Sequence, residues 1–103
     1  MQEINKLIGY INIAKKASYV IIGRENIETL RTKKFYLIIT DSSASDNLKN
    51  FAKKIAEEKN CNNIQLNKIK LEQLVNIDHC KIIGIKNKNL SLIIEDLIKR
   101  CED

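Results

Sequence analysis

The sequence predicts an α/β protein, a three-layer α/β/α sandwich with a four-stranded mixed sheet. Two observations lead there. Short β-branched apolar runs alternate with segments whose apolar residues recur every three or four positions, and such alternation places helices on both faces of a sheet. The 103 residues, 44% apolar and 30% charged, have the composition of a globular chain. We therefore expect one domain over residues 1–103, folding without metal or disulfide.

The first elements are a helix, a strand and a second helix. Residues 4–14 predict an amphipathic helix, because one apolar stripe contains Ile4, Leu7, Ile8, Ile11 and Ala14. Residues 19–22 predict a short buried strand that Gly23 ends. Residues 25–32 predict a helix with Ile27 and Leu30 facing inward.

The middle of the chain predicts a strand over 35–40 and a long helix that ends near Lys59. The strand is a continuous β-branched and aromatic run. The cluster of Asp, Ser and Ala at 41–46 is typical of a helix start. We expect the inward side of the long helix to contain Leu48, Phe51, Ala52, Ile55 and Ala56.

The last third predicts a strand, a short helix, a strand and a closing helix. These span residues 64–66, 68–75, 80–85 and 90–100. The closing helix is expected to bury Leu90, Ile93, Ile94 and Leu97. Cys80 opens the last strand and suits a small buried apolar position.

The positive charge is concentrated near the start. The net charge is +5, and residues 1–34 hold seven basic and three acidic residues, against eleven and ten in residues 35–103. A local excess of this kind predicts a surface that binds anions.

Nothing in the sequence predicts a membrane or secreted protein. No apolar run approaches the roughly 20 residues that span a bilayer, and the N-terminus lacks the pattern of a signal peptide. The three cysteines form no CxxC pair. We therefore expect a cytoplasmic protein with no membrane partner.

Residues 11–23 carry a motif. The pattern of apolar residues, Ala14, the pair Lys15-Lys16, Ala17, Val20-Ile21 and Gly23 resembles the start of bacterial YlxQ-type proteins. These belong to the superfamily of kink-turn-binding ribosomal proteins that includes archaeal L-seven-Ae and L-thirty-e. Residues 38–41 and 44–47 resemble that family's next strand and its Asp-Ala-Ser-x-Asn helix start.

The resemblance implies a non-enzymatic protein that binds structured RNA, either ribosomal RNA or another kinked stem, with the ribosome as a candidate partner. In that family the turn glycine and the N-terminus of the second helix face RNA, and the residues after the glycine contact guanine edges and phosphates. A second contact comes from the loop before the last strand, where an apolar residue covers an unstacked base. The implied RNA-binding residues are Lys15, Lys16, Gly23, Arg24, Glu25, Asn26, Thr29, Arg31, Lys33, Lys34, Asn76, Ile77, Asp78 and His79.

Some positions depart from the family pattern. Kink-turn readers have Asn followed by Glu and then a Lys, whereas this chain has Glu25, Asn26 and Thr29. Ser18 and Tyr19 stand where the family has Gly-Lys. The alternative function is therefore a protein-interaction module of the same fold that no longer binds RNA specifically.

Structural roles compete for the same residues. Gly23 also suits an ordinary turn with positive φ, and Glu25 and Asn26 also suit the first turn and cap of a helix. Ile77 also suits the core. The lysine pairs are also typical of a solvated helix face.

Catalysis and metal binding have little support. Residues 40–43 offer hydroxyls and a carboxylate at a strand end, but His79 is the single histidine, and helix capping explains the cluster. His79, Cys80 and Cys61 lack the spacing of metal ligands. We expect no catalytic residue, metal or cofactor.

Overall fold

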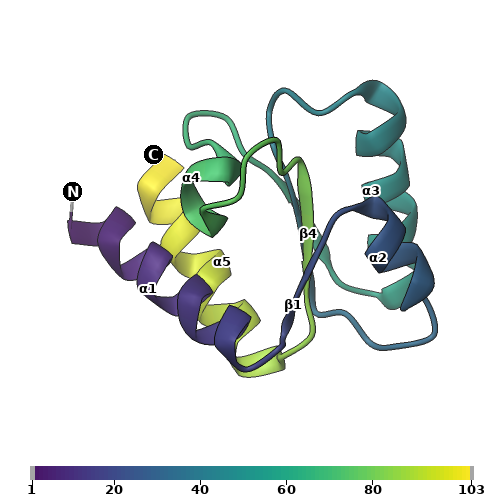
Figure 1. Cartoon of the computed structure of the whole chain (residues 1–103), viewed down its shortest axis with the longest axis horizontal. Coiled ribbons are helices and arrows are strands. Elements are labelled where there is room, and N and C mark those ends of the chain that lie inside the picture. The colour runs from purple at the N-terminus through teal and green to yellow at the C-terminus, as the bar shows by residue number, and fades with distance from the viewer. Residues whose placement is uncertain (1, 103) are drawn as a thin grey trace.

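The computed structural model describes residues 2–102, which form three layers (Figure 1). Helices α1, α4 and α5 cover one face of the sheet, and α2 and α3 cover the other. This confirms the predicted α/β/α sandwich. In chain order the elements are α1 (Gln2–Lys16), β1 (Val20–Ile22), α2 (Arg24–Thr29), β2 (Leu37–Thr40), α3 (Asp46–Lys59), β3 (Asn62–Gln65), α4 (Leu71–Val75), β4 (Ile82–Ile85) and α5 (Lys88–Glu102).

The sheet of the described chain has four strands in the order β1-β4-β2-β3. Strand β4 runs antiparallel to both of its neighbours, whereas β2 and β3 are parallel. The sheet is therefore mixed, as predicted. Because β2 and β4 occupy the centre, each of their residues is buried.

Side-chain alternation along the central strands divides the core into two halves. Leu37 and Ile39 of β2 pack toward α1, α4 and α5. Ile38 points to the opposite face, where it joins Ile27 of α2 and Ile55 of α3. Successive residues of a strand face opposite sides of the sheet, so an apolar β2 supplies both cores at once.

Two predictions about burial were wrong. Strand β1 is half-buried, not buried, because it lies at the edge of the sheet and only β4 pairs with it. Ile93 is 39% exposed, although it was predicted to face inward. Helix α5 instead buries Ser91, Ile94, Leu97 and Ile98, a stripe that excludes position 93.

Several boundaries differ from the predicted ones. Helix α2 ends at Thr29, three residues early, where the Arg31 N–H donates to the Glu28 carbonyl at 3.2 Å in a tighter turn. Strand β2 begins at Leu37, so Phe35 is buried outside it. Helix α4 begins only at Leu71, and α5 is longer than predicted at both ends. Helix ends are set by local hydrogen bonds that periodicity does not report.

A glycine in β4 allows the sheet and the α2–α3 layer to approach each other. A Cβ on Gly84 would lie 2.7 Å from Cδ1 of Phe35 and 3.3 Å from Cδ1 of Ile38. Both side chains are almost fully buried. We predict that Gly84→Ala lowers the free energy of unfolding by about 1–3 kcal/mol through overpacking, measurable by urea denaturation.

Gly9→Ala is the matched control. Gly9 lies on the exposed side of α1, and a Cβ added there would have no atom within 4 Å. The same substitution there should stabilise the helix by about 0.5–1 kcal/mol. Equal urea midpoints for Gly84→Ala and the unsubstituted protein would contradict the prediction.

Candidate nucleic-acid interface

Gly23 joins β1 to α2, and Gly23 with the first three residues of α2 (residues 23–26) is here called the Gly23 turn. Gly23 has φ 88° and ψ 152°, a backbone conformation that is essentially restricted to glycine. Its N–H donates to the Ile82 carbonyl of β4 at 3.0 Å. Within residues 2–102 no side chain caps α2. The turn is therefore anchored to the sheet by its backbone and leaves the side chains that follow in solvent.

Arg24, Glu25 and Asn26 are all exposed. The Arg24 guanidinium carbon lies 4.6 Å from the ring centroid of Phe51 on α3, a cation–π distance. The Asn26 side-chain amide donates to the Ile22 carbonyl at 2.7 Å, which leaves its oxygen as an acceptor. The alternative role of Asn26 as the cap of α2 is therefore not observed. Its side chain instead bonds the last carbonyl of β1.

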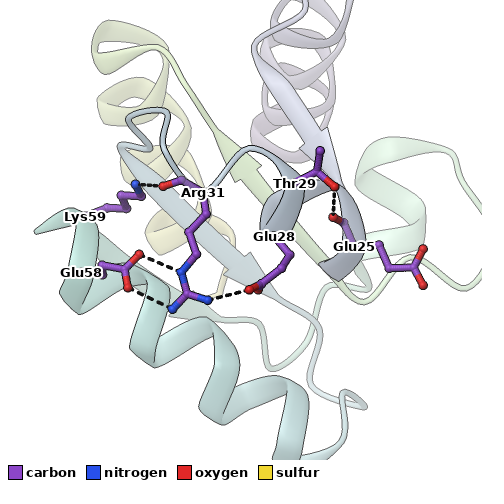
Figure 2. A network of polar contacts seen from close by, with 6 residues as sticks. All are labelled: Glu25, Glu28, Thr29, Arg31, Glu58 and Lys59. Carbon is purple, nitrogen blue, oxygen red and sulfur yellow. Dashed lines mark hydrogen bonds and ion pairs between the residues drawn. The ribbon is translucent and has the colours of Figure 1, made fainter.

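Thr29 turns its hydroxyl back onto its own helix. The hydroxyl donates to the Glu25 carbonyl at 2.9 Å (Figure 2), a bond that threonine commonly makes four residues back in a helix. The Thr29 hydroxyl therefore donates its proton within α2 and not to a ligand.

The loop 76–79 precedes β4. Asn76 and His79 have φ 57° and 61°, both left-handed, and the His79 N–H donates to the Glu72 carboxylate at 2.7 Å. Asp78 and His79 are exposed. Ile77 is half-buried against the α1, α4 and α5 side of the core, in agreement with a core role.

The Gly23 turn and the loop 76–79 approach the same end of the sheet (Figure 1). The end of β1 is held to the start of β4 by the bond between Gly23 and Ile82. The loop reaches β4 through Cys80, which is 5% exposed, and Lys81. Two segments at least 50 residues apart in sequence thus lie at the same end of the sheet.

Asp41 organises this end of the sheet. It is 3% exposed, and one carboxylate oxygen accepts the Leu71 N–H at 2.8 Å, at the start of α4. The other accepts the Ser43 N–H and hydroxyl at 3.0 and 2.6 Å and lies 3.7 Å from the Lys81 ammonium. Ser45, not Asp41, caps α3, through a bond from the Leu48 N–H at 3.1 Å.

The hydrogen bonds of Asp41 shift its titration. Burial alone would raise the pKa of Asp41, but the bonds from Ser43 and Leu71, with the charge of Lys81, hold the pKa below its usual range. The carboxylate therefore joins three segments: its own loop, the start of α4 and the start of β4.

The lysine pairs lie away from the Gly23 turn. Lys33 and Lys34 are exposed and precede β2, and β1 and β2 start at the same end of the sheet because each is antiparallel to β4. Lys16 is exposed in the last turn of α1, four residues before β1. The Lys15 ammonium donates to the Val75 carbonyl at 2.6 Å, so it anchors α4.

Arg31 is held by intramolecular ion pairs. Its guanidinium donates twice to Glu58 of α3, at 3.0 Å each, and once to Glu28 at 2.7 Å (Figure 2). The Lys59 ammonium also donates to the Arg31 carbonyl. These hydrogen bonds raise the pKa of Arg31 further above its usual range and lower that of Glu58. Arg31, predicted as a phosphate contact, joins α2 to α3.

A groove between α2 and α3 was not predicted from the sequence. It has a volume of about 610 Å³ and is lined by Arg24, Glu25, Glu28, Arg31, Asn47, Asn50, Phe51 and Lys54. The four α3 residues are spaced i, i+3, i+4 and i+7, which places them on one helix face. The sequence shows this spacing. It does not show that the polar residues Asn47, Asn50 and Lys54 line a groove, because that depends on α2 packing beside α3.

Metal-binding clusters and membrane-spanning helices are both absent from residues 2–102. No group of three or more His, Cys, Asp or Glu side chains there is arranged to hold a metal ion. None of the helices in that part of the chain combines the length and apolar character needed to cross a membrane.

Comparison with known proteins establishes the fold. A protein of unknown function from Bacillus halodurans superposes with a TM-score of 0.77 over 91% of this chain and 97% of its own, at 19% sequence identity. No family model matches the chain, and no curated protein does. The two chains share the three-layer architecture.

We predict that Asp41→Asn lowers the free energy of unfolding at pH 7 by about 1–3 kcal/mol, because an amide cannot accept all of these hydrogen bonds and one buried donor loses its partner. Since the pKa of Asp41 is depressed in the folded state, its stabilisation is complete above the unfolded value near 3.9 and is lost as pH falls through the folded value. The difference between the two proteins should therefore narrow below about pH 4.

Urea denaturation followed by circular dichroism between pH 7 and pH 2 measures this difference. Asp46→Asn is a suitable control, because Asp46 is exposed at the start of α3 and should change the free energy of unfolding by less than about 1 kcal/mol. If the difference in the free energy of unfolding between wild type and Asp41→Asn stays constant down to pH 2, the prediction is wrong.

Proposed function

We propose that this protein is a non-enzymatic RNA-binding module that docks on structured RNA through the Gly23 turn and the loop 76–79. The observation that carries the proposal is that Arg24, Glu25 and Asn26 are exposed at the end of the sheet that the loop also reaches. An exposed turn with mixed donors and acceptors, beside a second loop, suits an irregular RNA helix, which presents both base edges and phosphates.

The side chains offer complementary chemistry. The guanidinium N–H groups of Arg24 can donate to phosphate or guanine. Glu25 and the free oxygen of Asn26 can accept from base amino groups. His79, exposed on the loop, can stack or donate. Together they support recognition of a kinked stem better than of a uniform duplex, whose bases are hidden in the deep groove.

The contact surface is smaller than the one the resemblance implied. Lys33 and Lys34 lie at the other end of the sheet, and Arg31 is held by Glu28 and Glu58. Lys15 is tied to Val75. We therefore place Arg31, Lys33 and Lys34 outside the surface, with Lys15 at its border because its ammonium bonds the residue just before the loop. We assign the RNA contact to residues 23–26 and 76–79, in the cytoplasm, on ribosomal or other kinked RNA, without a cofactor.

A gel shift with the full chain tests the proposal. The probes are a kink-turn hairpin, a straight RNA duplex of equal length, and either one with heparin as a polyanion competitor. We expect the hairpin to be retained in the presence of heparin and the duplex to be displaced, because non-specific binding rests on charge alone. Equal displacement of both would overturn specific RNA recognition.

The second candidate is a protein-interaction module of the same fold. It is supported by large apolar side chains in solvent, with Ile13 54%, Leu92 59% and Ile93 39% exposed. Exposed apolar side chains of this size favour protein contacts over RNA phosphates. Loss of specific RNA binding in the gel shift, together with a solution mass above 11.9 kDa at concentrations near 0.1 mM, would favour this function.

Arg24→Gln is predicted to weaken hairpin binding and to reduce the slope of log K against log salt by about one, as expected for one lost phosphate contact. Lys33→Gln is the matched control, because it removes the same charge from an exposed residue at the opposite end of the sheet. Its salt slope should equal that of the wild type. Equal reductions in both variants would show that binding follows net charge and not the Gly23 turn.

A further inference from the structure

We propose that the groove between α2 and α3 binds one unpaired nucleobase of the RNA, stacked on the Arg24 guanidinium where that group lies over Phe51. This inference rests on the proposed function, since the base belongs to the same bound RNA. It extends the contact from the Gly23 turn onto a face of α3.

The geometry of Arg24 carries the first step. Its guanidinium lies 4.6 Å from the Phe51 ring, and Phe51 is only 7% exposed, so the ring forms the floor beneath the cation. Arg24 itself is exposed. A guanidinium stacked on a ring at one side presents a flat second side, on which a planar base can stack.

The residues around the Arg24 guanidinium and the Phe51 ring suit the base edge and the phosphate of a nucleotide. Asn47 and Asn50 are exposed and line the groove on the same face of α3. Each amide offers both donors and acceptors, which match the mixed edges of bases. Lys54 lies one turn further along that face and lines the groove as well, where its ammonium can bind a phosphate oxygen.

The charges of the groove favour a nucleotide over an acidic peptide. Three basic and two acidic side chains line the groove. Of the acidic ones, the Glu28 carboxylate already pairs with Arg31 at 2.7 Å. Glu25 remains exposed beside Arg24. Glu25 repels any anionic group, but the amino group of a base can donate to it, which the carboxylate of an acidic side chain cannot do.

The two ends of the groove differ. Helices α2 and α3 run in the same direction, because Arg24 lies over Phe51 and Arg31, seven residues after Arg24, pairs with Glu58, seven residues after Phe51. The ion pairs of Arg31 bridge the helices at one end (Figure 2). The other end adjoins the Gly23 turn, so an RNA strand docked there can place a neighbouring base in the groove.

Nuclear magnetic resonance of the ¹⁵N-labelled full chain tests the groove directly. The probes are adenosine 5′-monophosphate, ribose 5-phosphate and tetraglutamate. We expect amide shifts at residues 24–25 and 47–54 with the nucleotide, at an affinity roughly fivefold or more above that of ribose 5-phosphate, which is the contribution of one stacked base. Equal affinities would overturn base stacking, and tighter binding of tetraglutamate at these residues would assign the groove to a protein ligand.

Variants connect the groove to RNA binding. Phe51→Leu should weaken hairpin binding about fivefold or more by removing the ring, and Lys54→Gln about two- to fivefold, as for one exposed ion pair. Lys53→Gln is the matched control, because Lys53 is adjacent on α3 and exposed but lies outside the groove. If Phe51→Leu fails to fold, Asn50→Ala replaces it and should weaken binding while preserving the fold.

The two proposals can fail separately. Specific retention of the hairpin with unchanged affinity in Phe51→Leu, Asn50→Ala and Lys54→Gln would overturn the groove and leave RNA binding through the Gly23 turn in place. Failure of the unsubstituted protein to retain the hairpin would overturn both, and the gel shift alone would show it. Hairpin binding that weakens equally in Lys53→Gln and Lys54→Gln would also overturn the groove.

Discussion

The position of β4 constrains the rest of this structure. The strand lies between β1 and β2 and is antiparallel to both, so its main chain is paired on two sides. At its start, Gly23 donates to the Ile82 carbonyl and the Asp41 N–H donates to the Lys81 carbonyl. These bonds bring the Gly23 turn, the loop at Asp41 and the loop 76–79 to one end of the sheet, and so place the two segments of the proposed interface at the same end.

Some basic side chains of this protein make intramolecular contacts, and others are exposed to solvent. Arg31 and Lys59 hold the end of α2 against α3, Lys81 pairs with Asp41, and Lys15 reaches α4. Cations paired at close range contribute little to the field that an anionic partner meets. The excess in residues 1–34 therefore overstates the charge available at any one place, and Arg24 is the cation of that segment that lies at the Gly23 turn.

The sequence alone predicts the three layers of the fold, but not the strand order or the side-chain contacts between helices. Periodicity identified the α1 and α3 stripes and the β2 run because burial follows local pattern, and the turn at Gly23 was visible because few other residues adopt its conformation. The edge position of β1, and hence its half-burial, depends on a strand order that local pattern does not encode. The partners of Arg31 and the groove floor at Phe51 depend on how α2 packs beside α3, and that packing joins residues 27 positions apart.

The Gly23 turn is fixed from two directions, and this bears on how it would bind. Its backbone is bonded to β4 through Gly23, and the far end of the short α2 is tied to α3 through Arg31 and Glu58. The Arg24 side chain, otherwise among the most mobile in a protein, already lies over Phe51. Ordering such a side chain on binding costs about 0.5–1.5 kcal/mol. A turn that is positioned before its partner arrives avoids part of that cost, and the six residues of α2, too few to be stable alone, are held in place by the elements on either side.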